Sequence, residues 1–212
     1  MTGSIIRMAL MYLRQVRGRR RARGRGARPA APAAQARRHP PERVQRHRFQ
    51  NCRAAVAFLN AGNEMGRANP QFSPRVARPT VTAAPGGGFT ASADVAWTYN
   101  AARSTTALTR PEWPNMTDAD RAAVQRFLDA LRVHEDGHHE VARDYAPGAG
   151  TTVTAHGATL QQARHNLQQA LNEHRREVRR ELRARGDEYD RITEHGRNQQ
   201  ARGGQNVRLN CP

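Results

Sequence analysis

The chain has 212 residues with 35 basic and 18 acidic side chains, a formal net charge of +17 and only 5% aromatic residues. No run of about 18 apolar residues occurs, which excludes an integral membrane protein. The charge is uneven, because residues 1–53 hold 15 arginines and one acid, whereas residues 54–212 hold 20 arginines and 17 acids. Length and charge together predict one domain preceded by a basic tail.

The tail is rich in Arg, Gly, Pro and Ala and has almost no large apolar side chains between Gly18 and Arg48. Such a segment cannot bury enough apolar surface to become ordered, so we expect a disordered tail over residues 1–48. The domain is expected over residues 49–205, followed by a C-terminal end of residues 206–212. No aromatic residues interleave with the arginines, so the tail gives little support for specific nucleic-acid binding.

The sequence contains few features that indicate export or a redox compartment. The one candidate for a signal peptide, residues 5–13, is short and has its arginine cluster after the apolar stretch rather than before it, so we expect no signal peptide there. Cys52 and Cys211 lie near the two ends of the expected domain. A disulfide and two free thiols are both compatible with this spacing.

Local patterns in the first part of the domain predict helices and a small sheet. Residues 49–60 have apolar side chains at helical spacing and indicate one short helix. Residues 76–109 alternate small or β-branched residues with polar ones around a Pro-Gly-Gly-Gly turn, which indicates a hairpin in a small antiparallel sheet. A capping-box pattern at residues 117–120 begins a helix that is expected to end at about Tyr145. Residues 150–157 are expected to form a loop.

A second long helical pattern begins near Leu160, with a break allowed at Gly186. The same phase continues through Tyr189 and Ile192 to His195. These elements predict an α+β fold in which a small antiparallel sheet packs on one long helix and a second long helical segment follows.

The strongest motif is His134-Glu135-Asp136-Gly137-His138, which matches H-E-x-x-H. Residues four apart lie one above the other on a helix, so both imidazoles can bind one Zn²⁺ from a single rigid element. Glu135 then lies beside the metal, where it can act as general base on a metal-bound water. Both histidines are in phase with the apolar residues of the helix, so we expect them on its buried face. Without a metal, the same pattern describes two hydrogen-bonded histidines on a charged helix.

A catalytic zinc site has three protein ligands and one open position, so a third ligand must come from elsewhere in the chain. The candidates are Glu173, His174, Glu177, Asp190, Glu194 and His195. A ligating histidine usually donates its other ring N–H to a carboxylate or carbonyl, and Asp190 or Asp144 can provide that acceptor. Tyr189 keeps the phase of the apolar stripe and is expected in the core, with a role near a developing oxyanion as the alternative.

A further motif, Tyr189-Asp190-Arg191-Ile192-Thr193-Glu194-His195-Gly196, follows the second helical segment. With the two motifs in this order, the chain resembles a bacterial family of domains predicted to be secreted zinc-dependent proteases, in which Y-D-x-x-T-x-H-G comes after H-E-x-G-H. Trp97-Thr98-Tyr99 and Pro111-Glu112-Trp113-Pro114 resemble the family's strand and its entry to the metal helix. The resemblance covers about residues 50–205. It implies a zincin-type metallopeptidase with one Zn²⁺ per chain and His195 as the third ligand.

Two functions follow from these patterns. The favoured one is a zinc metallopeptidase, acting as an endopeptidase on a peptide or protein substrate, in which His134, His138 and His195 hold the metal and Glu135 moves the proton. The alternative is a zinc-stabilised, non-catalytic binding module whose Arg-rich tail contacts an acidic partner, either nucleic acid or an acidic surface. The resemblance also implies export from the cell.

Overall fold

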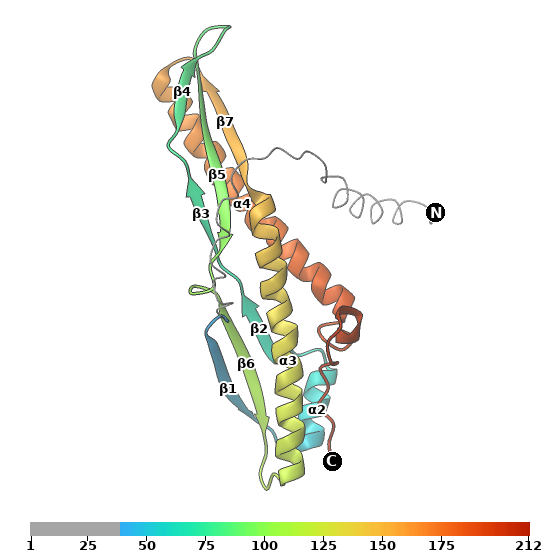
Figure 1. Cartoon of the computed structure of the whole chain (residues 1–212). Coiled ribbons are helices and arrows are strands. Elements are labelled where there is room, and N and C mark those ends of the chain that lie inside the picture. The colour runs from blue at the N-terminus through green and yellow to red at the C-terminus, as the bar shows by residue number, and fades with distance from the viewer. Residues whose placement is uncertain (1–38) are drawn as a thin grey trace, which may run out of the picture. The chain divides into compact units, whose positions relative to one another are not determined.

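Two small β-sheets and two long helices form the part of the chain that the computed structural model describes, residues 39–212 (Figure 1). The first sheet has the strand order β1 (Glu42–Arg48), β6 (Thr105–Glu112), β2 (Gly66–Asn69). β1 runs parallel to β6, and β2 runs antiparallel to it. β2 is therefore an edge strand whose second side has no strand partner within residues 39–212.

The second sheet is built around the long strand β5 (Phe89–Tyr99). β3 (Phe72–Val76) and β4 (Thr80–Ala83) follow one another along one edge of β5, and β7 (Thr151–Gly157) pairs with the other edge. All three pairings are antiparallel. The expected hairpin is confirmed, because β4 and β5 are joined through the Pro-Gly-Gly-Gly turn.

The helices begin where the sequence places good caps. The Asn51 side chain accepts a hydrogen bond from the first turn of α2 (Cys52–Asn60). Thr117 and Asp120 form the predicted capping box at the start of α3 (Asp118–Tyr145), which is followed by the short 3-10 helix η1 (Ala146–Ala149). α4 (Leu160–Thr193) is 34 residues long and is followed by a second 3-10 helix, η2 (Gln199–Arg202). No helix within residues 39–212 carries an apolar stretch long enough for a membrane span.

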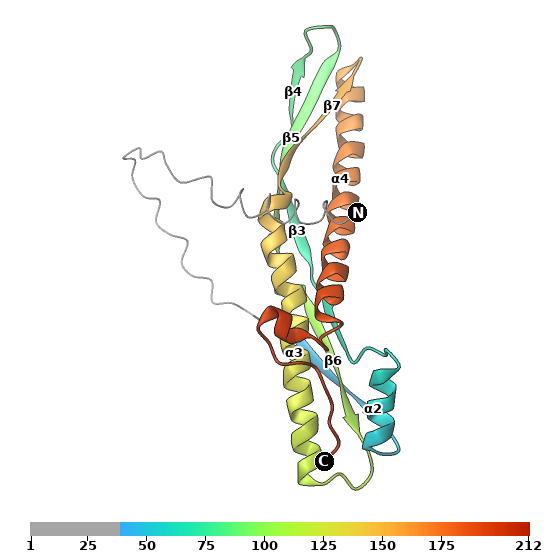
Figure 2. The ribbon, with the colours of Figure 1, turned by 90° about the vertical axis from the view of Figure 1, so that its right-hand side faces the viewer.

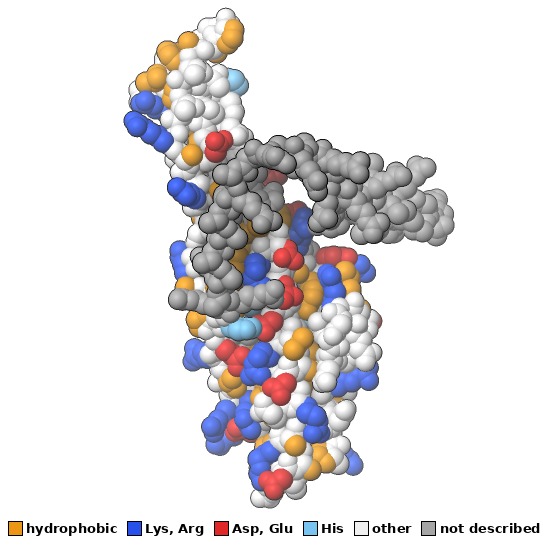
Figure 3. All heavy atoms as spheres, in the orientation of Figure 1, with side chains coloured by type: hydrophobic (Ala, Val, Ile, Leu, Met, Phe, Trp, Pro, Cys, Tyr) orange, Lys and Arg blue, Asp and Glu red, His pale blue; other side chains and the backbone are white. Residues whose placement is uncertain are grey.

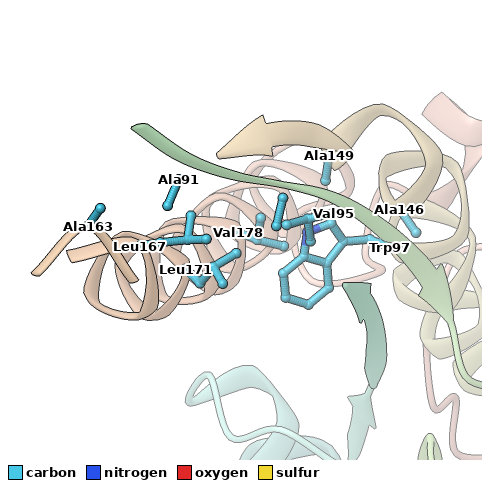
Figure 4. Packing of buried hydrophobic residues seen from close by; sticks show 10 residues of the cluster. Ala91, Val95, Trp97, Ala146, Ala149, Ala163, Leu167, Leu171 and Val178 are labelled. Carbon is cyan, nitrogen blue, oxygen red and sulfur yellow. The ribbon is translucent and has the colours of Figure 1, made fainter. Parts of the chain in front are cut away.

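Two apolar clusters hold these elements together. One lies between the second sheet and α4, and Figure 4 shows side chains of β5 and α4 meeting around Trp97. The other lies between α2, α3, β6 and the C-terminal segment, with Phe127 fully buried among its members. The two long helices contact each other near Gly137 of α3 and Tyr189 of α4, and Figure 2 shows both helices from the side.

A disulfide joins the beginning of α2 to the C-terminus. Cys52 and Cys211 are 159 residues apart in the sequence, and their Cα atoms lie 5.8 Å apart. Leu209, two residues before the second cysteine, is buried in the cluster around α3. The disulfide therefore fixes the last residues of the chain against α2.

Two of the expected elements are wrong, and one open alternative is decided. Residues 42–48 form β1 rather than part of a tail; all seven side chains are exposed, so hydrogen bonding to β6 orders them without an apolar pattern in the sequence. Residues 151–157 form β7 rather than a loop. Val153 and Ala155 of this strand are partly buried against the cluster around β5, and no residue of the strand is fully buried. α4 does not break at Gly186 and continues to Thr193.

The α+β class is confirmed, with two small sheets in place of the single antiparallel sheet that was expected. The parallel pair of β1 and β6 is the feature that the sequence did not indicate. The first 38 residues, which include most of the expected tail, lie outside the described part of the chain.

Candidate metal centre

The two histidines of the H-E-x-x-H motif meet an aspartate from α4. His134 and His138 lie one turn apart on α3, and their Nε2 atoms are 3.2 Å and 3.0 Å from the same oxygen, Oδ1 of Asp190. One donor atom from each of these three residues lies within 4.8 Å of the others. We call these residues the His-His-Asp group.

Hydrogen bonds fix the orientation of His134. Its Nδ1 is 3.1 Å from Oε1 of Gln199, so the ring directs Nε2 toward Asp190. The Tyr189 hydroxyl donates to the backbone carbonyl of His134 at 3.2 Å, and the two rings are stacked. Tyr189 is also buried, which matches the expectation that it belongs to the core.

α3 and α4 come close together because the motif contains a glycine. A Cβ atom at Gly137 would overlap the hydroxyl group and ring of Tyr189. Any larger residue at this position would push the two helices apart. The second variable position of H-E-x-x-H, Gly137, therefore sets the distance at which α4 brings Asp190 to the two histidines.

Glu135 lies under the edge strand β2. Its side chain is almost fully buried, and a Cβ atom at Gly66 of β2 would overlap its carboxylate. Burial raises the pKa of Glu135, while the nearby His138 and His134 and a hydrogen bond from the Ala68 backbone oppose that rise. The carboxylate is thus held beside the His-His-Asp group by a strand that can approach only because residue 66 is glycine.

The two carboxylates of the site have opposite pKa shifts. Burial disfavours the charged form of Asp190, but hydrogen bonds from His134 and His138 hold its pKa well below the usual value. Burial lowers the pKa of His134, and its hydrogen bonds with Asp190 and Gln199 outweigh this and raise it. An ionised carboxylate suits a cation ligand, and a carboxylate with a raised pKa suits proton transfer.

The group lies in a cleft of about 970 Å³. Its walls come from the end of α2, from β2, α3 and the last turns of α4, and from residues 207–210 of the C-terminal segment. His134, Glu135, His138 and Asp190 all line it. The cleft is large enough to admit a segment of polypeptide beside these residues.

Other predicted site residues lie at the rim or elsewhere. His195 lines the cleft, but its side chain is 64% exposed and its Nδ1 is 3.8 Å from Oδ1 of Asp190, so it is not part of the His-His-Asp group. Glu194 also lines the cleft. Asp144 is exposed near the end of α3 and does not line the cleft, so the structure does not bring it to the histidines.

The remaining candidates for the third ligand lie further along α4. His174 accepts a hydrogen bond from Trp97 Nε1 at 3.1 Å in the cluster around β5. Glu173 is exposed and Glu177 is exposed one turn later. None of the three lines the cleft.

The roles of two residues in this region could not be predicted from the sequence. Gln199 lies in η2, after the second motif, and a single glutamine gives no signal of contact with a histidine 65 residues earlier. His139 follows the motif and is fully buried, with Tyr99 and Thr106 each 3.0 Å from one of its ring nitrogens. Burial lowers the pKa of His139 to about 4, so it is a neutral link between α3 and both sheets.

The donor set fits a divalent metal ion. Two imidazole nitrogens and one carboxylate oxygen match the ligand types of zinc sites that keep an open position. The Gln199 contact also fits, because ligating histidines usually donate their other ring N–H to an oxygen. These observations define a class: an α+β protein with a candidate His-His-Asp metal centre in an open cleft.

The chain matches the bacterial protein family of unknown function DUF922 over residues 63–196 and belongs to that family. The matched range contains both motifs, from His134 to His138 and from Tyr189 to Gly196. Comparisons with curated proteins and with solved structures gave no match. The family description assigns no activity, so peptide-bond hydrolysis stays a prediction.

Proposed function

We propose that this protein is a zinc-dependent peptidase with a zincin-like arrangement of its active site. The observation that carries the proposal is that α4 brings Asp190 to both histidines of the H-E-x-x-H motif while Glu135 lies beside them in the same cleft. A purely structural zinc site is normally closed by four ligands, whereas in the described part of the chain this group offers three and opens to a cleft.

His134, His138 and Asp190 would hold one Zn²⁺ per chain. When bound, the metal supplies a Lewis acid that polarises a carbonyl group and makes water a stronger nucleophile at neutral pH. Asp190 is proposed as the third ligand because its oxygen already lies 3.0–3.2 Å from both imidazoles. The family resemblance implies His195 instead, and this untested assignment is the alternative to Asp190.

Glu135 is the proposed general base. It is buried against β2, where Gly66 lies next to its carboxylate. In that place it would take the proton from the attacking water and pass it to the nitrogen of the leaving amine. Gln199 and Tyr189 would act only through His134, by holding its ring and its backbone carbonyl.

The edge of β2 that has no strand partner within residues 39–212 favours a peptide as the substrate. Met65 accepts a hydrogen bond from Thr109 of β6, and alternate residues of a strand direct their backbone groups to opposite edges. Gly66 and Ala68 therefore direct theirs away from β6, toward the cleft that they line. An extended peptide added to this edge would have its backbone next to Glu135.

The test is Glu135→Gln, with Glu140→Gln as the matched control on the same helix. Because Gln cannot take up the proton, hydrolysis of a mixture of quenched fluorescent peptides is expected to fall at least about 100-fold, with zinc content unchanged. Glu140 is exposed, so its variant is expected to keep the parent's rate. The proposal is contradicted if Glu135→Gln cleaves as fast as the parent.

The non-catalytic binding module remains the second function, and most of its supporting feature, the Arg-rich tail, lies outside the described residues. It predicts bound zinc without hydrolysis in the parent. The same peptide mixture therefore separates the two functions.

A further inference from the structure

Four arginines form a row on the outer face of α4. Arg176, Arg179, Arg180 and Arg183 have the spacing i, i+3, i+4, i+7, which places them on one side of the helix. All four are exposed, and the apolar residues that α4 buries lie on the opposite side. We call this row the arginine stripe.

The stripe is a local excess of positive charge. In the part of the chain that the structure describes, none of its four guanidinium groups has a carboxylate partner within ion-pair distance. By contrast, Arg185 on the same helix pairs with Glu181 at 3.0 Å, and Arg132 of α3 pairs with Glu42. On the face seen in Figure 3, basic and acidic side chains lie interspersed. Four like charges on one helix face repel each other unless a partner neutralises them.

The stripe leads to the candidate metal centre. Arg183 lines the cleft, and Asp190 follows seven residues later on the same helix. With a rise of about 1.5 Å per residue, Asp190 lies about 10 Å along the helix from Arg183 and about 21 Å from Arg176. Whatever binds the stripe can therefore extend directly into the cleft.

We propose that the arginine stripe binds a run of Asp and Glu side chains in the polypeptide whose neighbouring residues enter the cleft. An extended chain advances about 3.3 Å per residue, so the acidic run lies about three to six residues from the position next to Asp190. The inference rests on the proposed function for the cleavage that follows in the cleft. The binding itself needs no hydrolysis.

Charge favours an acidic polypeptide over a nucleic acid. Beyond the stripe, the cleft is lined by five carboxylates, on Glu64, Glu135, Asp187, Asp190 and Glu194, and by three further arginines, Arg67, Arg197 and Arg208. A phosphate backbone carries negative charge at every step, so it would be attracted by the stripe but would find no excess of positive charge in the cleft. A polypeptide with an acidic run followed by neutral residues matches both regions.

The experiment measures binding by fluorescence anisotropy with the full chain. The probes are a labelled peptide that joins four glutamates to a neutral segment, the same peptide with four glutamines, and an oligothymidylate. The stripe variant combines Arg176→Gln, Arg179→Gln and Arg180→Gln, which leaves the cleft residue Arg183 unchanged. The control variant removes three exposed arginines on other elements: Arg75→Gln, Arg103→Gln and Arg126→Gln.

The glutamate peptide is expected to bind more tightly than the glutamine peptide, and the stripe variant is expected to weaken that binding by about 10-fold. The control variant has the same net charge and should stay within about 2-fold of the parent, and added salt should weaken the binding. Equal binding of both peptides, an equal loss in both triple variants, or a loss confined to the oligothymidylate would each overturn the proposal. Because the experiment measures binding and not hydrolysis, its result can be interpreted even if the protein proves not to be a peptidase.

Discussion

Two carboxylates of the site lie close together and face different surroundings. Asp190 accepts hydrogen bonds from two imidazoles, which hold its pKa low. Glu135 is enclosed by α3 and β2, and burial raises its pKa. The difference between a cation ligand and a proton acceptor therefore arises from the neighbours of each side chain rather than from its residue type.

The third ligand can be identified with single substitutions. Asp190→Asn is expected to weaken zinc binding by more than about 100-fold, beyond the usual effect of removing a partner of a ligand. His195→Ala is expected to change the affinity by less than about 10-fold, because its exposed ring lies outside the His-His-Asp group. Asp187→Asn, on the same helix and in the same cleft, is the control. Competition with a chromophoric chelator measures all three affinities, and the reverse order for Asp190 and His195 would assign His195 as the ligand.

The sequence predicted the part of the site that lies on one helix. His134, Glu135 and His138 are connected by helical spacing alone, and the structure places them together on α3. Asp190 was among the candidates, but its contact with both imidazoles depends on how α4 crosses α3, which no local pattern encodes. Gln199 could not be predicted, because its contact with His134 forms only when η2 folds back on the crossing.

At the scale of elements, the crossing of α3 and α4 positions the site. Gly137 lets Tyr189 approach α3, and Tyr189 directly precedes Asp190 on α4. A separation of the helices would move the carboxylate away from both histidines at once. The geometry of the site is therefore coupled to the packing of one glycine.

Gly137→Ala is expected to destabilise the protein by about 1–3 kcal/mol, because the added methyl group overlaps Tyr189. Gly186→Ala is the control, since its Cβ atom would lie 3.7 Å from the nearest side-chain atom, an ordinary contact. Ala in an unhindered helix interior is more stable than Gly by up to about 1 kcal/mol, so this control should stabilise. Urea unfolding measures both. A Gly137→Ala variant as stable as the parent would contradict the role given to the crossing.

Helices were easier to predict than strands, for a physical reason. The caps and apolar stripes of α2, α3 and α4 are local, so their starts could be predicted from the sequence. β1 is exposed throughout and β7 is only partly buried, and both are held by backbone hydrogen bonds to strands far away in the chain. These two strands form because they pair with strands that lie next to them only in the folded protein.

At the scale of the whole described chain, the disulfide and the arginine stripe both lie next to the cleft. The disulfide between Cys52 and Cys211 holds residues 207–210, which form one wall of the cleft, against α2. The arginine stripe approaches the cleft along α4. Metal binding would add a further link between α3 and α4, so zinc should also raise the free energy of unfolding of the whole unit.

The central claim is that the His-His-Asp group binds one zinc ion, and elemental analysis of the purified protein tests it most directly. The account predicts about one zinc per chain in the parent and loss of most of it in His134→Ala. His165→Ala, which removes an exposed histidine of α4, should keep the parent's content. No metal in the parent after supplementation with zinc, or equal zinc in the parent and His134→Ala, would contradict the account.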